Sequence, residues 1–155
     1  MARKPHTPPS VRNKRALHNY EVLERLEAGI VLTGSEVKSL RSARASIEEA
    51  WATINGEEVF LRDLNISPYA NAGYSQHMPT QERKLLLHRR EIKKLLTRVT
   101  QKGLTLIPLA LYFNERGRVK IELALCRGKQ LHDKREDLKA RDADREMRRS
   151  MRPKR

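Results

Sequence analysis

The sequence predicts a mainly β protein: a small antiparallel barrel with flanking helices and a basic C-terminal tail. Residues 104–126 read as two strands with alternating apolar residues, joined by a loop that contains Gly117. Residues 51–61 read as a second hairpin around Asn55-Gly56. Short strands need a closed sheet to remove their exposed edges, which favours a barrel. With 155 residues and 38% hydrophobic content, the chain can build one core but not two.

The first segment, residues 1–16, is expected to be a flexible basic arm. It contains five Lys or Arg residues, no acidic residue, and the prolines Pro5, Pro8 and Pro9. Such a segment buries too little apolar surface to offset the entropy of ordering. Residues 1–15 hold no apolar run like that of a signal peptide, so none is expected.

Residues 20–32 are rich in apolar and β-branched residues, which predicts a strand with a bulge or bend at Gly29. A capping box follows, with Thr33 as N-cap and Glu36 three positions later. It predicts a short helix that ends near Ala45.

Side chains three positions apart share a face of that short helix. Val37 and Leu40 are therefore expected to face the core. Lys38 and Arg41 share the flanking surface.

In the hairpin at residues 51–61, both turn positions are expected to take positive φ, which suits Asn55-Gly56. Residues 66–79 read as a loop, and residues 85–87 as a short buried run.

The strongest helix prediction covers residues 88–102 and ends at Gly103. Its apolar residues recur at helical spacing. They are Ile92, Leu95, Leu96 and Val99. The other face is basic and carries Arg89, Arg90, Lys93, Lys94 and Arg98.

Residues 104–126 carry two alternating apolar series, each expected to line one face. The first is Ile107, Leu109, Leu111 and Phe113, and the second is Val119, Ile121, Leu123 and Leu125. After Gly128 the composition changes, and residues 129–155 hold almost no core-forming side chains. We expect a tail that is disordered alone and orders on a partner.

The charge distribution indicates a polyanionic partner. The formal net charge is +14, but residues 17–125 hold 16 Lys or Arg against 13 acids, so the two ends carry most of the excess. Such an excess attracts nucleic acid or an acidic membrane surface. No apolar run approaches the roughly 20 residues of a spanning helix. RNA is favoured over DNA because no helix-turn-helix, zinc finger or basic zipper is visible.

Signs of metal or nucleophile chemistry are lacking in the sequence. The histidines have no ligand spacing with one another or with the single cysteine. They are His6, His18, His77, His88 and His132. As the single cysteine, Cys126 excludes an internal disulfide, and it is expected to be a buried or half-buried strand thiol. No GxSxG, HExxH or Gly-rich phosphate loop is present. We therefore expect neither an enzyme nor a cofactor.

Two carboxylates leave alternatives open. Glu36 is either the capping-box acid or a ligand contact. Glu27 precedes Ala28-Gly29, where backbone can approach a ligand, and could accept hydrogen bonds from a base edge or a ribose hydroxyl. A plain surface charge is equally compatible with the position of Glu27.

Four motifs, in order and at matching spacing, resemble one bacterial family from end to end. They are Asn13–Tyr20; Glu27-Ala28-Gly29 with 34–41; 83–88 with Tyr112-Phe113; and Gly128-Lys129 with 133–136. Each motif alone is weak, but the series is similar to the SmpB family, also called SsrA-binding proteins. Two positions depart from the family pattern, because Gln81 and Gln130 stand where basic residues are common.

The resemblance implies an OB-like barrel that binds the tRNA-like domain of tmRNA and escorts it to ribosomes stalled without a stop codon. It implies that the tail becomes helical in the 16S rRNA decoding centre and the empty mRNA channel. Elongation factor Tu accompanies the delivery complex in that family, and the protein catalyses nothing. A cytoplasmic monomer without a membrane partner is expected. The implied parts are a basic arm (1–16), an RNA-binding barrel (17–128) and the tail (129–155).

The resemblance also assigns residues by position. On or supporting the tmRNA surface it places Asn13, Lys14, Arg15, His18, Tyr20, Glu27, Gly29, Glu36, Lys38, Arg41, Arg83, Lys84, Leu86 and His88. For ribosome engagement by the tail it gives Gly128, Lys129, His132, Asp133, Lys134, Arg135, Lys139, Arg141 and Arg145. The alternatives are a ribosomal or assembly-type rRNA-binding protein with a similar barrel, and a nuclease or other RNA-modifying enzyme.

Overall fold

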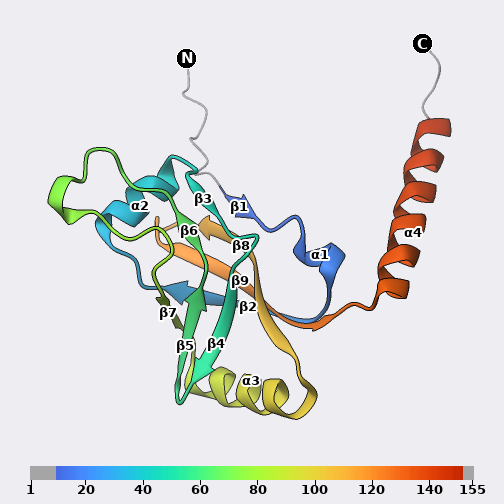
Figure 1. Cartoon of the computed structure of the whole chain (residues 1–155), viewed down its shortest axis with the longest axis horizontal. Coiled ribbons are helices and arrows are strands. Elements are labelled where there is room, and N and C mark those ends of the chain that lie inside the picture. Colours follow the sequence, from blue (N-terminus) through green and yellow to red (C-terminus); the bar gives the residue numbers. More distant parts are fainter. Residues whose placement is uncertain (1–9, 152–155) are drawn as a thin grey trace.

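The computed structural model describes residues 10–151, with the side chains of residues 75, 101, 102 and 131–133 left outside that description. A barrel of strands forms the body, with α3 below it and α4 standing apart at one side (Figure 1). The strands are β1 (Val11–Arg12), β2 (Tyr20–Ile30), β3 (Ala45–Ser46), β4 (Trp51–Asn55), β5 (Glu58–Arg62), β6 (Asn65–Ile66), β7 (Arg83–Leu86), β8 (Thr105–Phe113) and β9 (Val119–Gly128). The helices are α1 (Ala16–Asn19), α2 (Gly34–Arg41), the 3₁₀ turn η1 (Gly73–Ser75), α3 (Arg89–Lys102) and α4 (Leu131–Ser150).

Six antiparallel strands close the barrel in the order β8-β4-β5-β7-β2-β9, because β9 also pairs with β8 along its length. The β8 strand meets β4 near its start, where Ala52 pairs with Leu106. Near its end it meets β1, where Val11 pairs with Leu111. The predicted antiparallel barrel with flanking helices is thus confirmed.

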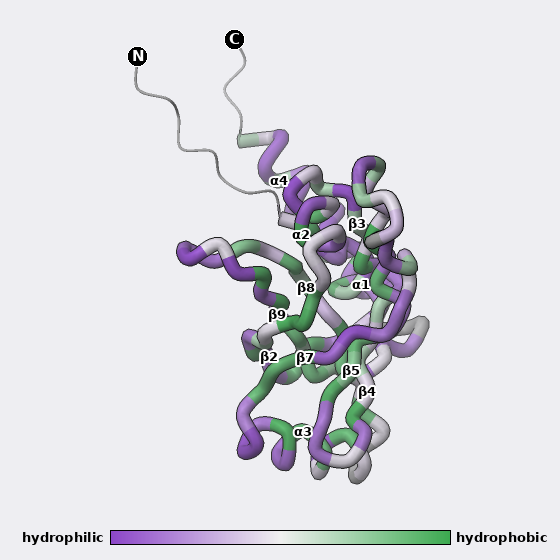
Figure 2. Tube along the Cα trace, turned by 90° about the vertical axis from the view of Figure 1, so that its left-hand side faces the viewer, coloured by the Kyte–Doolittle hydropathy of each residue, from purple (hydrophilic) through white to green (hydrophobic). Residues whose placement is uncertain are grey.

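Two hydrophobic clusters form the core. The larger one fills the barrel, and Leu61, Ile121 and Leu123 in it have no exposed surface. The smaller one lies under α1 and contains Ala16, Ile107, Leu109, Ala124 and Cys126. Figure 2 shows the hydrophobic strand segments gathered in the body and the hydrophilic α4 outside it.

The prediction that Ile107, Leu109, Leu111 and Phe113 line one face is wrong. The β8–β9 register shifts between Pro108 and Ala110. An extra residue in one strand reverses the side on which later residues point. Ile107 and Leu109 therefore pack under α1, whereas Leu111 and Phe113 pack with the barrel cluster.

The bulge expected at Gly29 is also wrong in position. The β2–β9 register shifts between Val22 and Glu24, while Gly29 pairs regularly with Lys120. Gly29 also pairs with Leu86 of β7, and a Cβ at Gly29 would stand 3.2 Å from the Leu86 Cβ. The glycine is needed because β7 approaches β2 closely.

Both predicted helices of the body form, and their capping boxes are present. The Thr33–Glu36 box begins α2, which ends at Arg41 rather than near Ala45. Two residues after Arg41, Ala43 has a positive φ of 55°, so the chain is no longer α-helical there. At α3, His88 and Glu91 form a capping box, and Gly103 ends the helix at φ 59°.

Two shorter predictions need correction. Asn55 pairs with Glu58, so the β4–β5 turn is Gly56-Glu57 and only Gly56 takes positive φ. The buried run at residues 85–87 is not buried throughout, because Leu86 is 53% exposed. The β7 strand alternates, as expected for a strand with one face in water.

The N-terminal end of the chain differs from the expected division. Residues 11–16, assigned to the flexible arm, pack on the body through β1 and the buried side chain of Ala16. Residues 1–9 of that arm lie outside the described residues. At the other end, Gly128 closes β9 and the tail forms α4. None of the described helices is long and apolar enough to cross a membrane.

Candidate nucleic-acid interface

A buried ion pair anchors α2 to β7. Arg83 Nε donates to Glu36 Oε1 at 2.7 Å, and each side chain is 1% exposed. Glu36 also accepts from the backbone N–H of Thr33 and from the Gln81 amide, at 2.8 and 2.7 Å. Glu36 therefore acts as the capping-box acid and as the partner of Arg83 at once.

The Arg83 guanidinium uses its remaining N–H groups on the chain that leads into β7. It donates to the carbonyl oxygens of Leu64, Met78, Pro79 and Gln81, at distances from 2.6 to 3.4 Å. A charge buried this deeply is tolerated because it is paired and all its donors are used. The pair thus fixes α2 and the loop before β7 against the barrel.

Three of the site residues predicted from the sequence are buried. Glu36 and Arg83 are enclosed as described, and Asn13 is 6% exposed. The Asn13 amide donates to the Pro108 and Ile47 carbonyls, and its oxygen accepts from the Ala16 N–H. In this arrangement the three side chains hold the surface in place and do not face a ligand.

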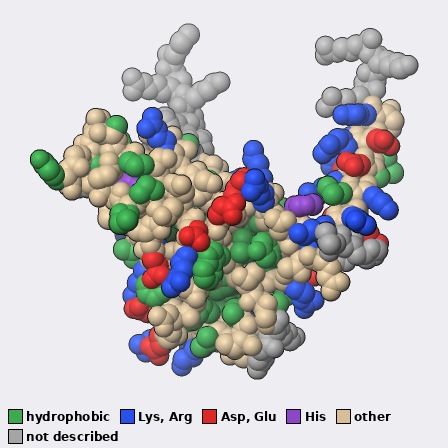
Figure 3. Space-filling view, in the orientation of Figure 1, with side chains coloured by type: hydrophobic (Ala, Val, Ile, Leu, Met, Phe, Trp, Pro, Cys, Tyr) green, Lys and Arg blue, Asp and Glu red, His purple; other side chains and the backbone are tan. Residues whose placement is uncertain are grey.

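Many cations on the body are neutralised by carboxylates. Arg62 pairs with Glu82 at 2.8 Å, and Lys84 with Glu58 at 2.7 Å. Glu24 holds both Lys94 and Arg98 of α3. The other paired cations of the body are Arg15, Arg25 and Arg89. Figure 3 shows acidic side chains lying beside basic ones on the body.

A second set of cations has no ion pair with any carboxylate among the described side chains. Most of this set gathers around α2, β1 and the β8–β9 hairpin, and we call it the basic surface. Its members are Arg12, Lys14, Lys38, Arg41, Arg44, Arg116, Arg118 and Lys120. Unneutralised cations attract phosphates most strongly, so this surface is the best candidate for nucleic-acid contact.

The basic surface is continuous because its elements touch. The Arg41 guanidinium lies 5.7 Å from the centre of the Phe113 ring, which joins α2 to β8. A groove of about 270 Å³ runs between α2 and the hairpin. Gly29, Val37, Leu86, Arg118 and Lys120 are among its lining residues. The exposed Leu86 thus lies between cations, where an apolar side chain can pack against a sugar or a base.

A second groove, of about 490 Å³, lies between the N-terminal segment and the outer face of β2, β8 and β9. Arg12, Lys14, Arg25, Tyr112 and Glu122 are among its lining residues. Arg25 donates to Glu122 at 3.2 Å. The Arg12 guanidinium and the Lys14 ammonium group remain available to phosphates.

Beside this groove, the Tyr112 hydroxyl donates to Glu27 Oε2. Partial burial and the adjacent Glu27 carboxylate raise the pKa of Tyr112 to about 12. The phenol therefore stays a hydrogen-bond donor at neutral pH and orients Glu27. A carboxylate oriented in this way can accept hydrogen bonds from a base edge or a 2′-hydroxyl.

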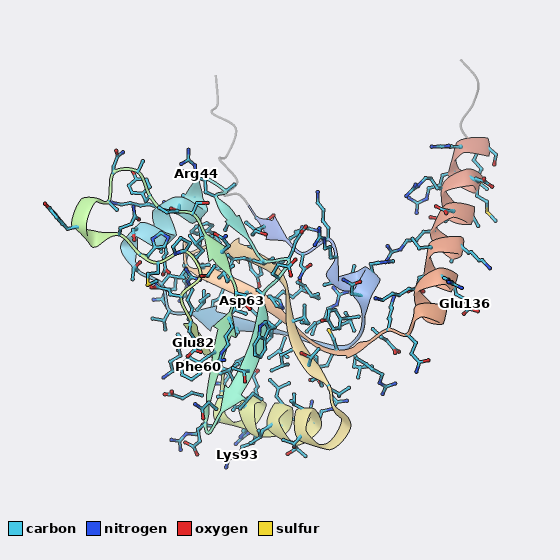
Figure 4. All side chains as sticks on the ribbon, viewed as in Figure 1. Arg44, Phe60, Asp63, Glu82, Lys93 and Glu136 are labelled. Atoms are coloured by element: carbon cyan, nitrogen blue, oxygen red, sulfur yellow. The ribbon has the colours of Figure 1, made fainter. Side chains whose placement is uncertain are left out.

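The structure does not bring every predicted site residue to this surface. His88 is the N-cap of α3, and its side chain is used in the capping box of that helix. Figure 4 shows Arg44 at the top of the body and Lys93 of α3 at the bottom. Arg15 pairs with Glu48 and Glu49 on the other side of α1.

His18 and Tyr20 lie at the end of α1, toward α4. Tyr20 pairs with Gly128 and packs against the smaller hydrophobic cluster. These two residues are therefore closer to the tail than to the basic surface.

Lys129 joins the tail to the body. Its Nζ donates to the Leu17 carbonyl at 3.0 Å and to the Asp137 carboxylate, and its backbone N–H donates to the Asn19 carbonyl. The Lys129 contact lowers the pKa of Asp137. We call this set of contacts the Lys129 joint.

Beyond the joint, the tail is open to solvent. Lys134 is half-buried, while Arg135, Lys139, Arg141 and Arg145 are exposed along α4. The side chains of His132 and Asp133 lie outside those described.

Several members of the basic surface were not assigned from the sequence. They are Arg12, Arg44, Arg116, Arg118 and Lys120, with Tyr112 beside them. The hairpin around Gly117 is predictable and sets Tyr112 opposite Lys120. The lack of a carboxylate partner for Lys120 depends also on the pairing with β2, which no local pattern indicates.

No group of three His, Cys, Asp or Glu side chains in the described residues could hold a metal ion. Cys126 is fully buried, as predicted, and burial raises the pKa of its thiol to about 11. At neutral pH that thiol is protonated and a poor nucleophile.

Comparisons with known proteins give matches along most of the chain. The model of the family described as SmpB protein matches residues 10–153. The SsrA-binding protein of Moorella thermoacetica is 54% identical over 140 residues, which cover 90% of this chain and 90% of that protein. The SsrA-binding protein of Symbiobacterium thermophilum is 50% identical over 153 residues, 98% of this chain and 97% of that protein.

A solved structure gives the same similarity. One chain of the structure described as "tmRNA-SmpB: a journey to the center of the bacterial ribosome" superimposes with a TM-score of 0.67. It is 49% identical in sequence, and the match covers 79% of this chain and 86% of that one.

Proposed function

Because the chain belongs to the SmpB family, we propose that it is the RNA-binding adaptor of trans-translation. It binds the tRNA-like domain of tmRNA and delivers it to ribosomes stalled without a stop codon. Rescue of the ribosome and tagging of the nascent peptide for degradation follow from that delivery.

The observation that carries the proposal is the basic surface. Its cations are gathered around α2, β1 and the β8–β9 hairpin and have no carboxylate partners among the described side chains. A rigid barrel suits an RNA of fixed shape, because little backbone freedom is lost on binding.

Within that surface, Lys14, Lys38 and Arg41 would contact phosphates, and Glu27 and Leu86 would contact bases or sugars. Gly29 would act by letting Leu86 lie close against β2 beside the RNA. Asn13, Glu36 and Arg83 would act by holding these groups in place, since they are buried. For Lys84 a tmRNA contact requires exchange of its Glu58 partner for phosphate.

The tail would act separately. An exposed helix with cations along its length can enter an rRNA channel only where mRNA is absent, so it would sense the empty channel by exclusion. Lys129, Lys134, Arg135, Lys139, Arg141 and Arg145 would bind phosphates of the 16S rRNA decoding centre and mRNA channel. In this role the protein catalyses nothing, arrives with elongation factor Tu, and works in the cytoplasm.

Binding selectivity tests the proposal. Purified protein is titrated at physiological salt with tmRNA, bulk tRNA and rRNA fragments in parallel. We expect a clear preference for tmRNA. Equal affinity for the three RNAs would instead support a general rRNA-binding protein and overturn the adaptor assignment.

A further inference from the structure

The loop between β6 and β7, residues 67–80, has no explanation in the barrel itself. We call it the finger. It projects at the left edge of the body in Figure 1, and Figure 3 shows hydrophobic side chains gathered there. Among its described side chains only His77 is buried. Apolar burial therefore does not hold the finger in shape.

Polar contacts hold the finger instead. The Gln76 side chain donates to the Tyr69 carbonyl at 2.7 Å and accepts from the Tyr69 N–H at 3.0 Å. These two bonds close the ring of residues 69–76, as a strand partner would. They leave residues 70–75 as a projecting tip.

His77 ties the finger to two other elements. Its Nε2 bonds to the Ile66 carbonyl at 2.9 Å, and its Nδ1 to the Ser35 hydroxyl at 2.8 Å. The carbonyl can only accept, so Nε2 carries the proton and Nδ1 accepts from Ser35. The buried histidine therefore links the finger to β6 and to the first turn of α2.

The root of the finger is fixed at both ends. The Ser67 carbonyl accepts from the Ser39 hydroxyl at 2.7 Å, and the Ser67 N–H donates to the Arg44 carbonyl at 2.9 Å. Arg83 donates to the Pro79 carbonyl at 3.0 Å. The finger is thus attached to α2 and to the buried ion pair beneath it.

At the tip of this stiffened loop, the side chain of Tyr74 is fully exposed. It lies in η1, which Gly73 enters at φ 56°. A flat aromatic ring held in water on a fixed support is prepared to bind, because little entropy is lost when it gains a partner.

We propose that Tyr74 is a stacking platform for an unpaired base of the RNA that the basic surface binds. The proposal rests on the proposed function and extends its contact area to the finger. Beside the finger root, Lys38 and Arg44 have no carboxylate partner among the described side chains, and the Lys38 Nζ lies 5.5 Å from the centre of the Tyr69 ring. Aromatic rings next to free cations are the combination that binds looped or single-stranded RNA.

The first test compares Tyr74→Ala, Tyr74→Phe and Met78→Ala for affinity to the tRNA-like domain of tmRNA at several salt concentrations. Met78→Ala is the matched control, since Met78 is also an exposed apolar residue of the finger. Stacking on one base predicts an affinity loss of about 5- to 150-fold for Tyr74→Ala. The salt slope should not change, because no phosphate contact is lost. Tyr74→Phe and Met78→Ala should bind as the unmodified chain does.

The second test needs no loss of affinity. Tyr74→Trp in a Trp51→Phe background leaves a single tryptophan at the tip, and stacking on a base should quench its fluorescence when RNA is added. Unchanged RNA affinity of Tyr74→Ala together with unquenched Trp fluorescence would overturn the proposal. So would a loss of ribosome binding by Tyr74→Ala with tmRNA affinity intact, because Tyr74 would then contact the ribosome and not tmRNA. If the unmodified chain itself shows no preference for tmRNA, the proposed function fails instead.

Discussion

The body and α4 both carry many charges, but they use them in opposite ways. In the body, many cations are held by carboxylates far away in sequence, as Arg98 of α3 is by Glu24 of β2, and the cations of the basic surface stand on elements that the barrel holds in place. In α4 the described ion pair within the helix is local, between Arg148 and Asp144 one turn apart. No described side chain of α4 is buried. The fold therefore fixes the cations of the body, whereas the helix alone places those of the tail.

This difference suggests two kinds of RNA contact. The basic surface keeps its shape before binding, as a reader of fixed RNA structure must. The tail has no tertiary packing to lose, so it can take up the shape of a channel. The Lys129 joint connects the body, which keeps its shape, to the tail, which can adapt.

The largest expected effect comes from removing the tail. A chain truncated after Lys129 should bind tmRNA nearly as well as the full chain but should give no peptide tagging. The reason is that no described side chain of α4 is buried against the body, and none belongs to the basic surface. RNA titration and an in vitro tagging reaction, on ribosomes stalled on mRNA without a stop codon, measure the two activities.

A thermal melt of the truncated chain serves as the control for folding. Loss of tmRNA binding by a folded truncated chain would contradict the division between body and tail.

The next largest effect is expected on the stability of the body alone. Glu36→Ala leaves the Arg83 guanidinium buried without its partner, which should lower the free energy of unfolding by about 3–5 kcal/mol. Urea unfolding followed by Trp51 fluorescence measures this loss. Glu58→Ala is the control, because its exposed pair with Lys84 contributes at most about 1 kcal/mol. If Glu36→Ala lowers the free energy of unfolding no more than the control does, the Glu36–Arg83 pair does not anchor α2.

Local patterns in the sequence predicted most of the elements that position the site. The Thr33–Glu36 capping box placed the start of α2, and the 3.6-residue spacing from Ile92 placed α3. The alternation on both sides of Gly117 predicted the β8–β9 hairpin. These signals lie within a few residues of one another, so no knowledge of the fold was needed to read them.

Features that depend on distant pairing were not predictable in this way. The bulges in β2 and β8 reflect how three strands fit together, and a single strand's alternation does not show them. The burial of Arg83 follows from a partner 47 positions earlier. For the same reason charge counting could not separate a free cation such as Lys120 from a paired one such as Lys84.

That separation between free and paired cations is open to a direct test. Arg118→Ala and Lys120→Ala should each weaken tmRNA binding and reduce the salt slope by about 0.9 for each lost phosphate contact. Arg62→Ala and Arg89→Ala are matched controls, since their partners are Glu82 and Glu57, and they should leave the slope unchanged. Affinity measured across a range of salt concentrations gives the slopes. Equal slopes for all four variants would show that pairing does not select the RNA-binding cations.

The smallest effect is expected at the Lys129 joint. In the folded protein, the contact with Lys129 lowers the pKa of Asp137, so the contact is favoured when the carboxylate is charged. The stabilisation that this contact gives to the Lys129 joint is fully present above the ordinary aspartate pKa of about 4 and is lost as pH falls through the lowered pKa. Asp137→Asn should therefore speed amide exchange in the first turns of α4 at neutral pH and leave the melting temperature of the body unchanged. Asp144→Asn, which breaks only the local Arg148 pair, should affect exchange near the end of α4 and not at its start. Equal exchange at the start of α4 in Asp137→Asn and the unmodified chain would mean that the bonds from Lys129 to Asn19 and Leu17, and not its contact with Asp137, attach the tail to the body.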